Sequence, residues 1–238
     1  MMPELDLNLG LIDHIAFGSG AIVLPTRKEE RKMSKLNFFE VFKVDLPEIN
    51  EDGFRVSKFD TRDPEWAINN IRYAMDGRGT EPGEYTMLVV DGVLWMSDTN
   101  AEAVDHYGFW LWVQRHRAKR ILINGLGMGC IVHALLAFDF VQRIDIVEFD
   151  QRVIDVIGAH YTNDPRVHIT HADAYEQTKQ WPKGTSWDAA WHDIWPDLCK
   201  DNLPEMKRLH QSYDTRVKHQ ESWGKEYIIR MRQQGGWR

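Results

Sequence analysis

The chain has few cysteines, no excess of positive charge and no long apolar run. Only 2 of its 238 residues are cysteine, Cys130 and Cys199. Two distant cysteines argue against a disulfide framework and favour a reducing compartment, so we expect a cytoplasmic protein. The formal net charge of −7 argues against binding along a nucleic-acid backbone, which needs clustered lysine and arginine.

Membrane and metal signals are missing as well. No stretch approaches the roughly 20 apolar residues of a membrane-spanning helix. The first residues, Met-Met-Pro-Glu-Leu-Asp, are acidic and form no signal-peptide core. No histidine or cysteine spacing is typical of a zinc site. We therefore expect no metal, no membrane and no nucleic-acid partner.

The first 99 residues predict an arm, at residues 1–35, followed by a β-rich lobe. Asp63-Pro64 is typical of a helix start, with the helix running to about Ala74. Asp91-Gly92 is typical of a two-residue hairpin turn. The segments rich in β-forming residues are 38–44, 54–59, 85–90 and 93–96.

From about residue 100 onward, apolar strands alternate with helical patterns. The predicted strands are 120–124, 143–148, 167–170 and 188–193. This alternation predicts an α/β fold with a Rossmann-like, doubly wound, mostly parallel sheet in a domain of residues 100–238. Only about 45 residues follow the fourth strand, so we expect a sheet shortened at its C-terminal end, with residues 215–220 as one further strand.

A glycine-rich loop follows the first of these strands. Gly125, Gly127 and Gly129 permit a tight turn and let a ligand approach the backbone. By itself the pattern is weak evidence for a ligand, because strand-to-helix turns also use glycine for steric reasons.

Three successive strands then deliver acids at their carboxyl ends: Glu148, Asp173 and Asp193. Open α/β sheets bind ligands at those ends, and a carboxylate in the place of Glu148 can accept hydrogen bonds from ribose hydroxyls. Each acid alone has a simpler explanation as a helix cap. Together they predict a nucleoside-binding site, with Phe149 as an apolar wall for the base.

These motifs resemble the class I S-adenosylmethionine-dependent methyltransferases, and most closely the spermidine synthase (polyamine aminopropyltransferase) branch. The hairpin Leu88–Asp98 followed by Asp105-His106 is similar to that branch too, so the resemblance spans roughly residues 85–197. The motifs that carry it are Ile121-Leu-Ile-Asn-Gly-Leu-Gly-Met-Gly, Val147-Glu-Phe-Asp, Asp164-Pro-Arg-Val, His171-Ala-Asp-Ala and Trp187-Asp-Ala-Ala-Trp-His-Asp.

The resemblance implies a cofactor, S-adenosylmethionine or its decarboxylated form, and a role for each matching residue. The three glycines would shape the loop on the methionine side. Glu148 would hold the ribose and Asp173 the adenine amine, while Phe149 and Ala174 would cover the adenine faces. Asp193 would be the catalytic residue at the reacting end.

Candidate contacts to the small-molecule substrate are Asp98, His106 and Trp195. His106 is chosen by position alone. Trp195 would wall a pocket for a small acceptor. His192 is a second candidate base beside Asp193, but a strand-end histidine with a structural hydrogen bond explains it more simply.

Three departures from the branch bear on the reaction. Met128 stands where aminopropyltransferases carry an aspartate that grips the amine, Pro196 stands where they carry a second aspartate, and Trp95 replaces a glutamine. A polycation needs several fixed carboxylates. We therefore expect a methyltransferase acting on a small or unknown acceptor, with a polyamine aminopropyltransferase and a non-catalytic nucleoside-binding module as alternatives. The sequence does not fix the oligomeric state, and a homodimer is one state consistent with it.

Overall fold

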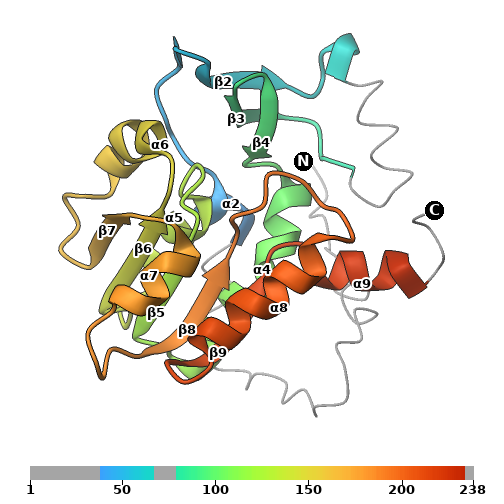
Figure 1. The fold of residues 1–238 in the computed structure, drawn as a ribbon. Coiled ribbons are helices and arrows are strands. Elements are labelled where there is room, and N and C mark those ends of the chain that lie inside the picture. The colour runs from blue at the N-terminus through green and yellow to red at the C-terminus, as the bar shows by residue number, and fades with distance from the viewer. Residues whose placement is uncertain (1–37, 67–78, 234–238) are drawn as a thin grey trace, which may run out of the picture. The chain divides into compact units, whose positions relative to one another are not determined.

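The structure, a computed structural model, describes residues 38–66 and 79–233. The chain divides into Met1–Lys35 and Leu36–Arg238, and everything below concerns the second part. The arm expected at residues 1–35, and the helix expected beyond residue 66, lie outside the described residues. Figure 1 shows an antiparallel sheet and a parallel sheet flanked by helices.

The antiparallel sheet has the order β1-β2-β3-β4. Its strands are β1 (Ile49–Glu51), β2 (Phe54–Asp60), β3 (Glu84–Val90) and β4 (Val93–Ser97). Asp91 and Gly92 both have positive φ, 50° and 81°, as the predicted hairpin turn requires. In β2 the alternate residues Phe54 and Val56 are buried, because successive strand side chains point to opposite faces. In β3 neighbouring residues are buried as well, including Leu88 and Val89.

The segment 38–44, predicted to be a strand, instead contains a short helix, α2 (Phe38–Phe42). Phe38 and Phe42 lie four residues apart and therefore share one helix face. Their rings pack on Trp110 and His106 at centroid distances of 4.9 Å each. The aromatic composition that favoured a strand serves to bury one side of a helix.

The parallel sheet has five strands in the order β7-β6-β5-β8-β9. All neighbouring pairs are parallel, and the chain reverses direction across the sheet at β5, as in doubly wound folds. The α/β prediction is confirmed, and the segment predicted at 215–220 is β9. The strands are β5 (Arg120–Asn124), β6 (Arg143–Glu148), β7 (Val167–His171), β8 (Trp187–His192) and β9 (Val217–Ser222).

Helices cover both faces of this sheet. The helices are α4 (Asn100–His116), α5 (Cys130–Leu136), α6 (Gln151–Val156), η2 (Gly158–His160), α7 (Ala174–Gln180), α8 (Asn202–Tyr213) and α9 (Lys225–Gln233). Figure 1 shows α7 and α8 in front of the sheet, whereas α2 and α4 lie behind it. No described helix has the length and apolarity to cross a bilayer.

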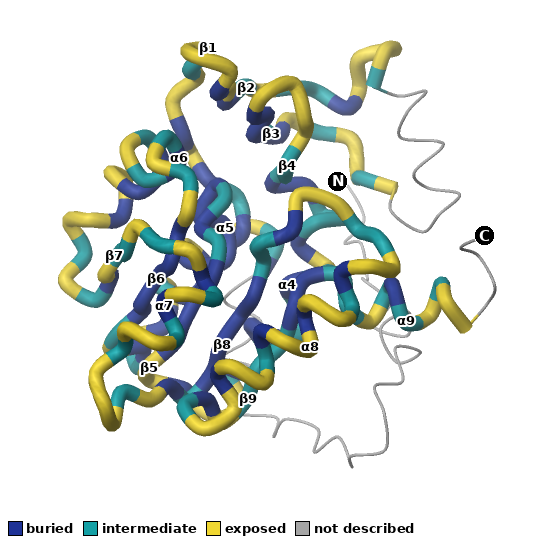
Figure 2. The backbone as a smooth tube through the Cα atoms, in the orientation of Figure 1, coloured by how far each residue is buried: buried dark blue, intermediate teal, exposed yellow. Residues whose placement is uncertain are grey.

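One apolar core connects the two sheets. Figure 2 shows the central strands β5, β6 and β8 of the parallel sheet as largely buried. Val56 and Leu88 of the antiparallel sheet belong to the same buried cluster as Trp110, Ile121 and Ile123. Leu122 points to the other face and joins a second cluster with Met206, Tyr213 and others.

An arginine also ties the hairpin to the parallel sheet. Arg152, in α6, donates to the Asp91 carboxylate at 3.1 Å and to the Asp52 carbonyl at 3.1 Å. Since α6 follows the carboxyl end of β6, this contact holds the hairpin turns beyond the carboxyl ends of the parallel strands. The domain boundary expected between residues 99 and 100 stays a prediction. The buried cluster contains residues from both sides of it.

Candidate nucleoside site

The strand register brings three predicted site residues to one level. Asn124 pairs with Val147 on one side and with His192 on the other. The residue after each is therefore Gly125, Glu148 or Asp193, at the same edge of the sheet. With about 4.8 Å between strands, the step from β7 to β8 spans about 14 Å.

The glycine loop is held tightly from two sides. Gly125 has φ 90°, and a Cβ there would collide with the carbonyl oxygen of Asp193. Gly129 has φ 75°, and a Cβ there would collide with the ring of Tyr161. Both positions require glycine for steric reasons. The structure of the turn therefore explains these two glycines without a ligand.

Glu148 fastens this loop to the end of β6. Its Oε2 accepts from the Leu126 N–H at 2.7 Å, and its Oε1 accepts from the N–H groups of Phe149 and Asp150 at 2.7 and 2.8 Å. Burial raises the pKa of this carboxyl, while the three backbone donors favour the ionised form. A carboxylate has about four acceptor positions, so one remains for a ligand hydroxyl.

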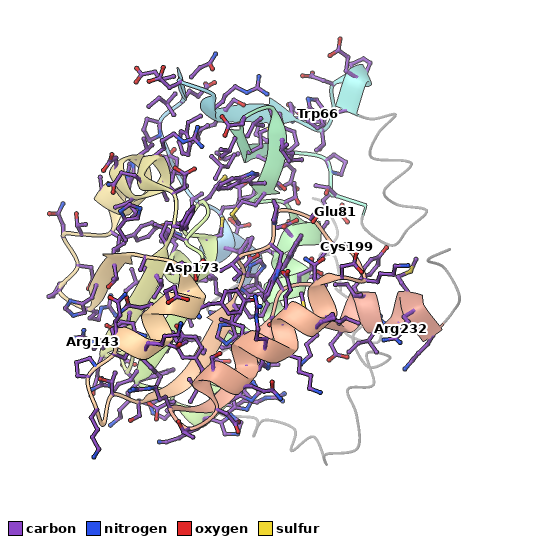
Figure 3. All side chains as sticks on the ribbon, in the orientation of Figure 1. Trp66, Glu81, Arg143, Asp173, Cys199 and Arg232 are labelled. Carbon is purple, nitrogen blue, oxygen red and sulfur yellow. The ribbon has the colours of Figure 1, made fainter. Side chains whose placement is uncertain are left out.

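Phe149, Asp173 and Ala174 lie at the ends of β6 and β7. The Phe149 side chain is 72% exposed, so its ring face is open to a ligand. Asp173, labelled at the start of α7 in Figure 3, caps that helix, because its Oδ1 accepts from the N–H groups of Tyr175 and Glu176. Ala174 is buried at 5% exposure. The cap explanation for Asp173 therefore holds, and a contact with adenine would fall to its other oxygen.

Asp193 is paired with His106. Its Oδ2 lies 3.5 Å from the Nε2 of His106, a histidine with 1% side-chain exposure. The Nδ1 of His106 lies 2.9 Å from the Glu102 carbonyl oxygen. Burial lowers the pKa of His106, but the hydrogen bond and the charge of Asp193 outweigh it, so that the pKa is raised. The sequence singled out both residues without indicating that they form a pair.

The structural explanation of His192 is the better one. His192 is fully buried, with its Nδ1 2.8 Å from the Asn124 amide and its Nε2 3.1 Å from the Gln220 amide oxygen. Burial, together with the nearby His210, lowers its pKa to about 3. A neutral imidazole with both nitrogens occupied is a poor general base.

Two residues predicted to contact substrate are buried with partners of their own. Asp98 is 3% exposed and accepts from the N–H groups of Thr86 at 2.6 Å and Val44 at 3.4 Å. Trp195 is 7% exposed and donates from its indole to Glu205 at 2.9 Å. These contacts give both side chains a structural role, and a contact of either one with an acceptor stays a prediction.

Two cavities lie away from the glycine loop. A cavity of about 470 Å³ between α7 and α8 touches the predicted site only at Asp173. A second, of about 200 Å³, is lined by residues including Met87 and Leu94 of the antiparallel sheet. Over the loop itself lies Met96 of β4, whose sulfur accepts from the Met128 N–H. Met96 gave no sequence signal, because it belongs to a strand about 30 residues earlier.

No family model matches the sequence. The chain is 33% identical over 72 residues to a polyamine aminopropyltransferase of Alkaliphilus oremlandii, a match covering 27% of this chain and 25% of that protein. It is 29% identical over 109 residues to spermidine synthase 2 of Hyoscyamus niger, covering 42% and 34%. The chain resembles the spermidine synthase branch. The matches span a quarter to a third of the length of these relatives.

Two solved structures show partial similarity to this chain. A spermidine synthase in complex with the transition-state analogue AdoDATO has a TM-score of 0.46 at 18% identity, over 72% of this chain and 54% of that one. The S-adenosylmethionine-bound amino pentose methyltransferase CalS10 of Micromonospora echinaspora has a TM-score of 0.37 at 14% identity, over 50% of each chain.

Proposed function

We propose that this chain is a transferase that binds S-adenosylmethionine, or its decarboxylated form, across the carboxyl ends of β5, β6, β7 and β8. The observation that carries the proposal is the register that puts Gly125, Glu148 and Asp193 at one level. The similarity to aminopropyltransferases over 72 and 109 residues supports the same ligand class.

The residues offer suitable contacts to each part of such a nucleoside. The exposed Phe149 ring presents an apolar face to a base. One oxygen of Asp173 is occupied as a helix cap, and the other would accept from the exocyclic amine. Glu148 keeps one acceptor position for ribose, as counted above. The sulfonium end would then lie toward Asp193, beside β8.

When bound, the sulfonium supplies a methyl or aminopropyl group to an acceptor nucleophile. Asp193 would receive the proton that this nucleophile releases, and its Oδ2 near His106 supports this role. His106 is in turn oriented by the Glu102 carbonyl. We assign His106 as a positioning residue, because its buried ring is held between Glu102 and Asp193.

We favour methyl transfer, because it needs mainly a nucleophile held close to the sulfonium methyl group, in line with the bond that breaks and shielded from water. Met128 is fully buried and carries no carboxylate into the loop, which weakens the case for a polycationic substrate. Aminopropyl transfer remains the second candidate, because both matched relatives described above belong to that class.

Calorimetry with S-adenosylmethionine, decarboxylated S-adenosylmethionine and methylthioadenosine tests the proposal. Tighter binding of the decarboxylated form would favour aminopropyl transfer. Absence of binding by all three would leave a non-catalytic module as the better explanation. Asp193→Asn should slow turnover more than it weakens nucleoside binding. The acceptor, the cytoplasmic location and a homodimer stay predictions.

A further inference from the structure

Met96 covers the middle of the glycine loop. Its Sδ accepts from the Met128 N–H at 3.0 Å, and it lies so close to Gly127 that a Cβ there would collide with it. Gly127 has φ 52°. The thioether of β4 therefore lies directly on the loop backbone, on the methionine side of the proposed nucleoside site.

The Met128 N–H is held less firmly than the loop donors around it. Gly125 donates to the Val147 carbonyl at 2.9 Å and Gly129 donates to the Leu126 carbonyl at 2.8 Å, while Leu126 donates to the Glu148 carboxylate. A thioether sulfur is only a weak acceptor. A stronger acceptor brought by a ligand would therefore replace Met96 at this donor and at none of the other three.

The loop itself brings no acid side chain to this donor. Met128 points into the core with 0% exposure, so the loop carries no acid of its own at that position. The Glu148 carboxylate already accepts from the Leu126 N–H of the loop. A carboxylate would find a backbone donor there that no aspartate of the loop faces.

We infer that Met96 guards a carboxylate-binding donor: its thioether occupies the Met128 N–H in the free protein and gives way to the carboxylate of a ligand's amino-acid tail. The inference rests on the proposed function and narrows it to S-adenosylmethionine over the decarboxylated form. Methionine has three rotatable side-chain bonds, so the sulfur can leave the loop without movement of β4.

Calorimetry on the full chain and its variants tests the ligand side. The wild type should bind S-adenosylmethionine about tenfold more tightly than its decarboxylated form. Met96→Ala, which frees the donor, should raise the affinity for S-adenosylmethionine about three- to tenfold. It should leave the affinity for methylthioadenosine, which has no amino-acid tail, within about twofold. Met87→Ala is the matched control, because Met87 lies on the opposite face of the same sheet and should change neither affinity.

Amide hydrogen exchange tests the contact without any ligand. Met96→Leu keeps the apolar volume but removes the sulfur, so the Met128 amide should exchange faster in this variant than in the wild type. An unchanged exchange rate of the Met128 amide in Met96→Leu overturns the inference. So does an equal change in the affinities for S-adenosylmethionine and methylthioadenosine in Met96→Ala. If no nucleoside binds the wild type, the proposed function fails and the inference fails with it. If methylthioadenosine binds but Met96→Ala leaves the affinity for S-adenosylmethionine unchanged, the inference alone fails.

Discussion

Replacing Glu148 with glutamine separates its two roles, in stability and in binding. Both carboxylate oxygens accept backbone hydrogen bonds from Leu126, Phe149 and Asp150. Glutamine has one acceptor oxygen, so its NH₂ group would face a backbone donor. One buried N–H left unpaired costs about 1–3 kcal/mol. We expect the free energy of unfolding in urea to fall by that amount, and Tm to fall by roughly 2–4 °C for each kcal/mol.

The same variant should abolish measurable binding of methylthioadenosine, because the remaining ribose contact is lost along with the loop geometry. Asp98→Asn is the matched control. Asp98 is another buried carboxylate bonded to two backbone N–H groups, but it lies just after β4 of the antiparallel sheet. It should cost similar stability while keeping nucleoside affinity within a few fold of the wild type.

Two results would refute this reasoning. Wild-type affinity in Glu148→Gln would remove the ribose assignment. Equal loss of affinity in Glu148→Gln and Asp98→Asn would mean that general destabilisation, and not a contact to the ligand, weakens binding. Calorimetry at a temperature well below both transitions keeps the comparison to folded protein.

Three further predictions concern single side chains. An NMR titration should give His106 a pKa above its ordinary value of 6.5. The stability that the charged His106 adds is present below pH 6.5 and is lost as the pH rises through the pKa of the folded state. Asp193→Asn should remove this pH dependence of stability. His192, with a pKa lowered to about 3, stabilises the fold above pH 6.5 and loses that contribution as the pH falls toward 3, costing roughly 2 kcal/mol by pH 5 in urea unfolding; an NMR titration of its ring near pH 6 would contradict this. Gly125→Ala should destabilise the fold by more than about 3 kcal/mol, because strain at positive φ adds to a backbone collision. Gly92→Ala, with positive φ but open space, should cost only about 1–2 kcal/mol, and equal losses for the two glycines would refute the collision argument.

The parallel sheet was predictable because its signals are local. The strands β5, β6 and β8 are short and largely apolar, with a glycine or an acid at their end or directly after it, and Asp173 follows β7 after one alanine. That order indicates the ligand edge before any coordinates are known. The turn at Asp91-Gly92 is equally local, since it depends on two residues that tolerate positive φ.

The partners within the site were not predictable, because they join distant segments. The contact of His106 with Asp193 and that of Met96 with Met128 both connect helix or strand residues to loops at the edge of the parallel sheet. The helix at Phe38–Phe42 was missed for a related reason. Its aromatic residues favour a strand locally, and only packing on α4 makes one helical face the better place to bury them.

The apolar cluster shared by the two sheets has a consequence for dissecting the molecule. Val56 and Leu88 on one side and Ile121 and Ile123 on the other are parts of a single buried assembly. Cutting the chain between residues 99 and 100 would expose that assembly on both fragments, so neither half should be recovered as a soluble, cooperatively melting species. Coexpressed halves should instead reassociate, and protease digestion of the intact fold should spare the junction at the start of α4.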